Sequence, residues 1–130
     1  MNFAAILRIL ADECGGGIGV ALLGSDGIPI EQVQATSLPP SLEVDPESLD
    51  DDLGAIGVEF GRVMDEARKA SDSISAGHVE EMLVKTARYL ILLHAVSDDA
   101  FLALAMVPDG NVGKARFLMR RHLHALREQL

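Results

Sequence analysis

The segment from Ile18 to Val33 restricts the fold more than any other part of this chain. Ile18–Leu23 is apolar on both alternating faces, which is typical of a strand covered on both sides. Asp26-Gly27 is a strong signal for a hairpin turn, and a second strand is expected from Ile28 to about Val33. Pro29 removes one backbone donor from that strand, so its N–H edge is predicted to point outward.

A helix is predicted before this hairpin. Apolar residues from Phe3 to Cys14 follow the spacing of one helical face, with Asn2 as a cap and Gly15 as a stop. A dinucleotide-binding glycine motif needs a strand before it and a helix after it, and here the order is reversed. The glycines are therefore interpreted as a helix stop followed by close strand packing. They are Gly15, Gly16, Gly17 and Gly19.

An acidic, proline-containing loop is predicted over residues 35–50, and a second helix from about Asp51 to Ala70. The carboxylates of Asp50 to Asp52 would complement the N-terminal dipole of that helix. Its apolar stripe is predicted to contain Leu53, Ile56, Phe60, Val63, Met64 and Ala67.

Three strands are predicted next, over 78–87, 88–96 and 101–107. The boundary between the first two lacks Gly or Pro, so a single helix over 79–93 is a competing interpretation. A third helix follows the break at Pro108 to Asn111, with an inward stripe of Val112, Ala115, Met119, His122, Leu123 and Leu126. The predicted fold class is α+β in one domain spanning 1–130: an antiparallel sheet with helices on both faces.

Composition argues against several functions. The net charge is −9, which argues against binding to nucleic acid or to an anionic membrane. The single cysteine, Cys14, excludes an internal disulfide, and the apolar runs are too short to span a bilayer, so a cytoplasmic location is expected. Gly113-Lys114 is followed by Ala115 rather than the Ser or Thr of a P-loop. The four histidines lack zinc-ligand spacing, so no catalytic residue, metal or cofactor is predicted.

The second helix carries an unusual row of glycines, Gly54, Gly57 and Gly61, along one flank of its apolar stripe. Each costs about 1 kcal/mol relative to alanine inside a helix, so close approach by another backbone is expected. The same helix of a second subunit, the domain's own sheet, or both would provide it, since small residues serve either contact. The opposite face is a mixed surface and a candidate partner site, formed by Ala55, Val58, Arg62, Asp65 and Lys69.

The whole chain resembles the roadblock/dynein light chain family, in its bacterial MglB-like branch. The resemblance rests on GVALLGSDGIPIEQ after the first helix and on VPDGNVGKARFLMRRHL at the start of the third. It implies a profilin-like αββαβββα domain with a five-stranded antiparallel sheet. It also implies a homodimer that continues this sheet by pairing third strands, with the second helices side by side. Met82 and Val84 of the third strand then join the three glycines as interface candidates.

The same resemblance implies a function. Members regulate or scaffold Ras-like small GTPases, and MglB-like proteins are GTPase-activating partners of an MglA-like GTPase. The resemblance therefore implies a protein that binds a GTPase as a homodimer and has no active site of its own. The alternative is a structural adaptor that tethers proteins without changing GTP hydrolysis, and a small-molecule sensor is a third class. Arg62 is the only arginine on the outer face of the second helix that could act as an arginine finger.

Overall fold

The computed structural model describes residues 2–40, 42 and 45–130. Among these residues it confirms the predicted order of helix, two strands, helix, three strands and helix. The elements are α1 (Phe3–Glu13), β1 (Gly17–Gly24), β2 (Pro29–Gln34), α2 (Pro46–Ser73), β3 (Glu81–Lys85), β4 (Leu90–Ser97), β5 (Ala100–Met106) and α3 (Val112–Glu128).

The strands form one antiparallel sheet in the order β2-β1-β5-β4-β3. All of β5 is buried, and so are Leu90 to His94 of β4, because these inner strands are covered on both faces. The apolar run Ile18–Leu23 pairs with β5 on one side and with β2 on the other. The two edges of the sheet are β2 and β3, and the edge position of β2 agrees with Pro29.

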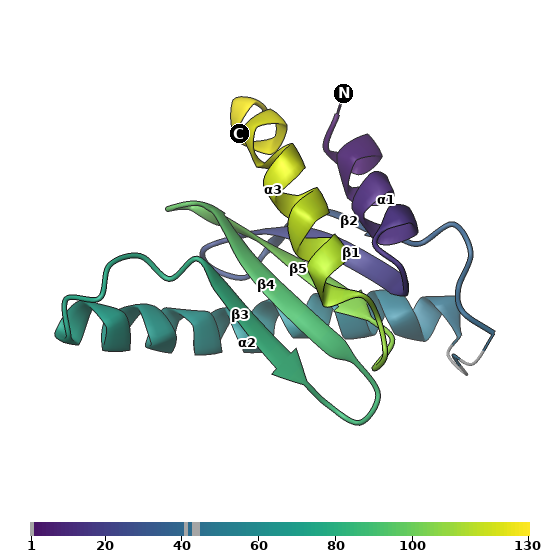
Figure 1. The fold of residues 1–130 in the computed structure, drawn as a ribbon, viewed down its shortest axis with the longest axis horizontal. Coiled ribbons are helices and arrows are strands. Elements are labelled where there is room, and N and C mark those ends of the chain that lie inside the picture. The colour runs from purple at the N-terminus through teal and green to yellow at the C-terminus, as the bar shows by residue number, and fades with distance from the viewer. Residues whose placement is uncertain (1, 41, 43–44) are drawn as a thin grey trace.

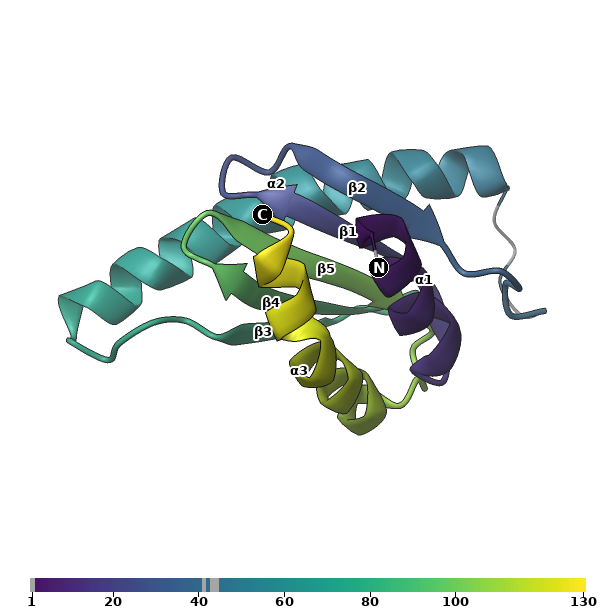
Figure 2. The same ribbon diagram turned by 90° about the horizontal axis from the view of Figure 1, so that it is seen from above.

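Helices cover both faces of the sheet, with α1 and α3 on one face and α2 on the other (Figure 1, Figure 2). Successive strand residues alternate between these layers. Leu22 and Leu104 pack in the cluster beneath α1 and α3, whereas Leu23 and Phe101 pack in the cluster against α2. The core is therefore two apolar layers separated by the sheet.

The glycines after α1 serve the close packing predicted for them. Gly16 has a φ of +105°, which favours glycine, and its carbonyl accepts a 2.9 Å hydrogen bond from the Val107 N–H. A Cβ on Gly17 would lie only 2.1 Å from the Ala11 carbonyl oxygen. These glycines thus join the end of α1 directly to the sheet.

The chain folds back between β3 and β4, so the competing single helix over 79–93 is not formed. Thr86 supplies the turn that the sequence does not mark with Gly or Pro. Its N–H donates to the Tyr89 carbonyl at 2.8 Å, and its Oγ1 accepts from the Tyr89 N–H at 3.0 Å. Because this turn takes residues 86–89, β3 ends before and β4 begins after the predicted boundary, and β3 also starts at Glu81 rather than at residue 78.

Helix α2 begins at Pro46, five residues before the predicted start, and extends to Ser73. Asp45 is its N-cap, since its carboxylate accepts the Glu47 N–H at 3.4 Å, and Pro46 occupies the first turn. The predicted loop over 35–50 was therefore too long at its C-terminal end. Residues 41, 43 and 44 of that loop lie outside the described residues.

Helix α2 is longer than the sheet that it covers. Its 28 residues span about 42 Å, whereas an eight-residue strand spans about 26 Å. Figure 1 shows its C-terminal part projecting beyond the sheet. A large part of the surface of α2 is consequently left to solvent.

Candidate interaction surfaces

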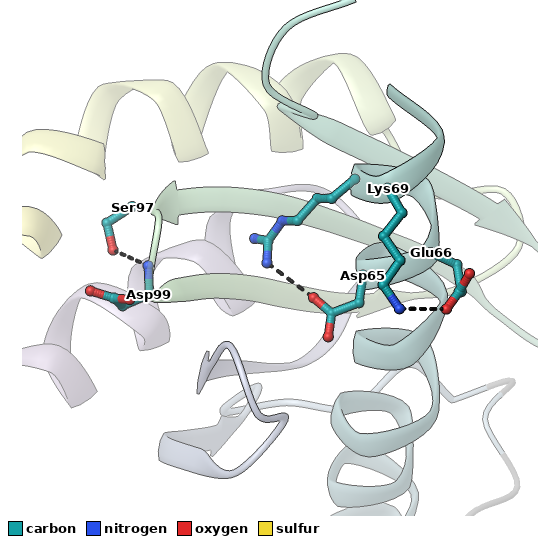
Figure 3. Close-up of polar contacts among 6 residues, drawn as sticks. Asp65, Glu66, Lys69, Ser97 and Asp99 are labelled. Carbon is teal, nitrogen blue, oxygen red and sulfur yellow. Dashed lines mark hydrogen bonds and ion pairs between the residues drawn. The ribbon is translucent and has the colours of Figure 1, made fainter. Parts of the chain in front are cut away.

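The structure places the predicted partner-binding residues together on the outer face of α2. Ala55, Val58, Arg62 and Lys69 are exposed there, and Asp65 is half-buried. Short ion pairs cover this face: Arg62 lies 3.6 Å from Glu59 and Lys69 lies 3.1 Å from Glu66. Arg68 pairs with Asp65 at 3.3 Å, and Figure 3 shows the last two pairs along the helix. Exposed pairs of this kind stabilise a fold weakly, so their charges remain available to a partner.

The β1–β2 hairpin adds an apolar surface beside this face that the sequence reasoning missed. A Cβ on Gly27 at its turn would lie 3.2 Å from the Val58 Cα, so the hairpin packs directly against α2. Next to this contact, Ile28 is 63% exposed and Ile30 is 45% exposed. Their shared face could have been found from the period of two in β2, but their exposure depends on where α2 lies.

Gln32 and Gln34 fix the position of β2 against the first turns of α2. The Gln34 Nε2 donates to the Pro46 carbonyl at 2.7 Å and to the Asp50 carboxylate at 3.0 Å, and the Gln32 Nε2 donates to the Asp50 carbonyl at 3.1 Å. The two isoleucines lie between this polar anchor and the Gly27 contact. We call Ile28, Ile30 and Val58 the hairpin patch.

Two of the three helix glycines face the chain's own sheet. A Cβ on Gly57 would lie 2.1 Å from the Leu23 Cδ2, and one on Gly61 would lie 3.2 Å from the Phe101 Cζ. Both glycines are buried, so contacts within the chain supply the close approach expected at them. Of the two explanations left open by the sequence, the domain's own sheet accounts for Gly57 and Gly61. Gly54 differs, since a Cβ there would have no described atom within 4 Å.

Gly54→Ala is expected to raise the free energy of unfolding by about 1 kcal/mol, because the added methyl meets nothing and alanine is the better helix former. The melting temperature of the chain should rise by about 4 °C. Thermal unfolding followed by circular dichroism, at concentrations where the chain is monomeric, measures this. A lower melting temperature there would contradict the prediction, whereas weaker self-association at high concentration would place another backbone at Gly54.

The other dimer-interface candidates lie at the opposite edge of the sheet. Met82 and Val84 are half-buried on β3 and pack at the margin of the α2 layer. Strand β3 has one strand partner among the described residues, so its outer edge is unpaired. Helix α2 packs chiefly on β1, β2 and β5, which leaves the β3 side of its layer thinly covered.

Val63 was predicted in the buried stripe of α2 but is 45% exposed. It lies about three turns after Asp52, whose carboxylate accepts a 3.2 Å hydrogen bond from the Tyr89 hydroxyl beside β3 and β4. Val63 thus lies on the side of α2 that faces these strands. We call Phe60, Val63, Met82 and Val84 the edge margin, an apolar surface next to the unpaired edge of β3.

The described residues show no grouping that indicates chemistry. Burial raises the pKa of the Cys14 thiol, which keeps it protonated and unreactive. Burial and then the neighbouring Asp52 raise the pKa of Tyr89. Within the described ranges, three or more His, Cys, Asp or Glu side chains nowhere come together to hold a metal ion. No described helix is both long and apolar enough to cross a bilayer.

A cleft of 580 Å³ opens where the C-terminal part of α2 approaches β4 and α3. Arg68, Arg120 and Arg127 line it, but Asp72, Glu80 and Asp98 line it as well, so its fixed charges balance. The Nε of Arg127 also donates to the Val96 carbonyl at 2.6 Å, and Arg68 is held by Asp65. Arg68 and Arg127 therefore serve packing contacts.

Comparison with known proteins supports the predicted fold. No protein-family model matches the sequence, and no curated protein matches it. Among solved structures, MglC from Myxococcus xanthus is 26% identical over 100% of both chains, with a TM-score of 0.71. A roadblock/LC7 domain from Streptomyces avermitilis is 14% identical over 98% of this chain and 97% of that chain, with a TM-score of 0.80.

An MglB structure with a tetrameric arrangement is also similar. It is 15% identical over 98% of this chain and 89% of that chain, with a TM-score of 0.78. The likeness extends from α1 to α3, because these matches cover 98–100% of this chain. The chain therefore has the roadblock/LC7 fold and resembles the MglB and MglC proteins.

Proposed function

We propose that this protein is a homodimeric, non-catalytic regulator that binds a Ras-like small GTPase through the outer face of α2 and the hairpin patch. The observation that carries the proposal is the apolar surface of Ile28, Ile30 and Val58, which is exposed beside a face of weakly paired charges. An apolar centre with a polar rim is the usual anatomy of a protein interface. The resemblance to MglB and MglC proteins supports a partner of the GTPase class.

Dimerisation would use the edge margin and the unpaired edge of β3. Pairing β3 with its copy would satisfy the outward backbone groups of both strands and bury Val63 and Met82. The outer face of α2 and the hairpin patch lie away from this margin. One dimer would then present two copies of the binding surface.

The adaptor alternative has an observation in its favour. Arg62 is the arginine of the outer α2 face, its side chain is 74% exposed, and its partner is Glu59 on the same helix. Nothing in the described structure holds Arg62 in a fixed direction for insertion into another active site. If this protein accelerates GTP hydrolysis, the acceleration would therefore come from ordering the catalytic residues of the GTPase itself.

The test uses a candidate Ras-like GTPase from the same organism. Its affinity for this protein is measured, and so is its single-turnover GTP hydrolysis with and without this protein. We expect binding, and we expect Val58→Asp to weaken it about 10-fold or more, because a buried, unpaired carboxylate at the centre of an apolar contact is costly. Phe117→Ala, on α3 across the sheet, is the control and should leave the affinity unchanged.

The rate separates the two functions. If this protein accelerates hydrolysis and the Arg62→Ala variant does so equally, activation without an arginine finger is supported. If Arg62→Ala lowers the accelerated rate by about 10³-fold or more, which is the usual contribution of an arginine finger, that role is assigned to Arg62. Binding without acceleration would support the adaptor. No binding to the GTPase, by a chain that circular dichroism shows to be folded, would overturn the proposed function.

A further inference from the structure

The outer face of α3 combines an exposed aromatic residue with a concentration of positive charge. Phe117 is 60% exposed. At 100° per residue, Lys114, Arg120 and Arg121 lie within about 60° of it on the helix surface. His124 lies there as well and contacts Glu128 at 3.0 Å. Helix α3 contains five of the eleven basic residues of the chain and one acidic residue, Glu128. The protein as a whole has a net charge of −9, so this helix opposes the general charge of the chain.

The basic residues of α3 divide into two groups by their contacts. Arg116 pairs with Glu81 of β3, and Arg127 donates to the Val96 carbonyl, so these two hold the helix on the sheet. Among the residues that the structure describes, Lys114, Arg120 and Arg121 have no ion-pair partner, although Arg120 also lines the cleft between α2, β4 and α3. Packing of α3 against the sheet therefore requires neither these three cations nor the Phe117 ring.

We propose that this α3 face, formed by Lys114, Phe117, Arg120 and Arg121, binds an acidic segment of another protein that also presents an apolar side chain to Phe117. The carboxylates of the segment would pair with the unpaired cations, and its apolar side chain would cover the ring. Clustered cations around an exposed aromatic side chain match this chemistry, since aromatic residues and arginine dominate the energetics of interfaces.

The acidic segment of this same chain does not meet this description. Residues 45–52 are acidic, but Leu49 is buried beneath the helix that they form, and Leu53 just after them is buried as well. Asp50 accepts hydrogen bonds from Gln34, and Asp52 accepts one from Tyr89. This segment of a second copy could offer only charge to Phe117 without unfolding, which favours a different protein as the partner.

The extent of the face favours a peptide segment over a nucleic acid or a membrane. Duplex binding commonly uses about 6–10 phosphate contacts, whereas this face has three unpaired cations on a single helix. Neighbouring α1, which packs beside α3, exposes Asp12 and Glu13 on the same layer. A wide anionic surface would meet these carboxylates, whereas a single segment along α3 would avoid them.

This surface lies on the face of the sheet opposite to α2, as Figure 1 shows. Occupancy of the α3 face would therefore leave the outer face of α2 and the hairpin patch open. The protein could hold an acidic partner and a GTPase at the same time. The inference does not depend on the proposed function, because it rests on other residues.

The experiment measures the fluorescence anisotropy of a labelled helical peptide made of glutamates with one stripe of leucines, titrated with the full chain. We expect saturable binding at about 50 mM NaCl that weakens about fivefold or more near 300 mM, because exposed charges are screened. Arg120→Glu with Arg121→Glu should weaken binding about 10-fold or more, and Phe117→Ala should weaken it about fivefold. Circular dichroism establishes that each variant is folded.

The matched control is Arg62→Glu with Lys69→Glu, which changes the net charge by the same amount on the outer face of α2. This control variant should leave peptide binding unchanged. If net charge alone governed the affinity, it would weaken binding as much as the α3 variant does. A peptide with glutamines in place of glutamates should not bind. Absence of binding to the acidic peptide, equal losses in both double variants, or tighter binding of a DNA duplex or a phosphatidylserine vesicle would overturn the inference.

Discussion

Gly57→Leu is expected to lower the free energy of unfolding by about 3 kcal/mol or more. The first atom of the new side chain would lie 2.1 Å from the Leu23 Cδ2, and Leu23 is fully buried. Moving the helix away from Leu23 would break its close contact with the hairpin, where the Gly57 carbonyl lies 3.1 Å from the position of a Cβ on Gly27. The gain of about 1 kcal/mol from removing a helical glycine does not offset this overpacking.

Urea unfolding followed by circular dichroism measures this loss, and the melting temperature should fall by about 10 °C. Gly54→Leu is the matched control, because it places the same side chain one turn earlier, where a Cβ meets no described atom within 4 Å. It should raise the free energy of unfolding of the monomer by up to about 1 kcal/mol, as Gly54→Ala does. If Gly57 instead served a dimer interface, Gly57→Leu would weaken self-association and leave the stability of the monomer intact, contrary to this prediction.

The parts of the fold that could be predicted are those whose signals are local. Ile18–Leu23 is apolar on both faces because β1 lies inside the sheet, and Asp26-Gly27 forms the turn beside it. The Gly27 N–H donates to the Gly24 carbonyl at 2.9 Å, and the Ile28 N–H donates to the Asp26 carboxylate at 3.0 Å. Both bonds join residues at most three apart, so a short stretch of sequence is sufficient for the turn. One further bond is distant, since the Ser25 N–H donates to the Asp99 carbonyl at 2.9 Å.

One error could have been avoided from the sequence. Asp45-Pro46 is a cap followed by a proline in the first turn, which is a standard helix start, yet the prolines and carboxylates around it favoured a loop. The continuation of α2 across Asp50 to Asp52 then brings Asp50 to β2 and Asp52 to Tyr89. Residues that were predicted only to complement a dipole thus also fix the position of the helix.

The surfaces could not be predicted in the same way, because they depend on distant partners. Periodicity places Gly57 on a flank of the helix, but its neighbour Leu23 is 34 residues away and is known only from the packing. Val63 is on the apolar stripe and still exposed, because the stripe is wider than the part of the sheet that it covers. The helical periodicity of the sequence indicates which residues of α2 face outward. It gives no information on the hairpin that lies beside them.

The backbone of β3 allows the proposed dimer to be tested with a single substitution. The Ala95 N–H donates to the Glu80 carbonyl and the Thr86 N–H donates to the Tyr89 carbonyl, so residues 80 and 86 point their backbone groups toward β4. Because these groups alternate along an antiparallel strand, those of residues 81, 83 and 85 point to the free edge. Leu83 is at the centre of that edge, and its side chain is 43% exposed.

Leu83→Pro is therefore expected to weaken the homodimer about 30-fold or more while the monomer stays folded. Proline removes an outward N–H that β4 does not use, and its ring obstructs a strand arriving at the edge. In a two-fold dimer the change acts once in each copy, so two hydrogen bonds worth about 1 kcal/mol each are lost together with the close fit. Sedimentation equilibrium over a range of concentrations measures the dissociation constant.

Leu83→Ala separates the backbone effect from the side chain, since it keeps the N–H and removes the exposed isobutyl group. A much smaller loss is expected for this variant, because main-chain pairing provides most of the affinity when one strand adds to another. If Leu83→Pro and the unsubstituted chain dimerise equally well, β3 pairing is excluded. The edge margin would then have to serve a different contact. Equal losses in both variants would instead assign the affinity to side-chain packing around Leu83, with no continuous sheet across the two copies.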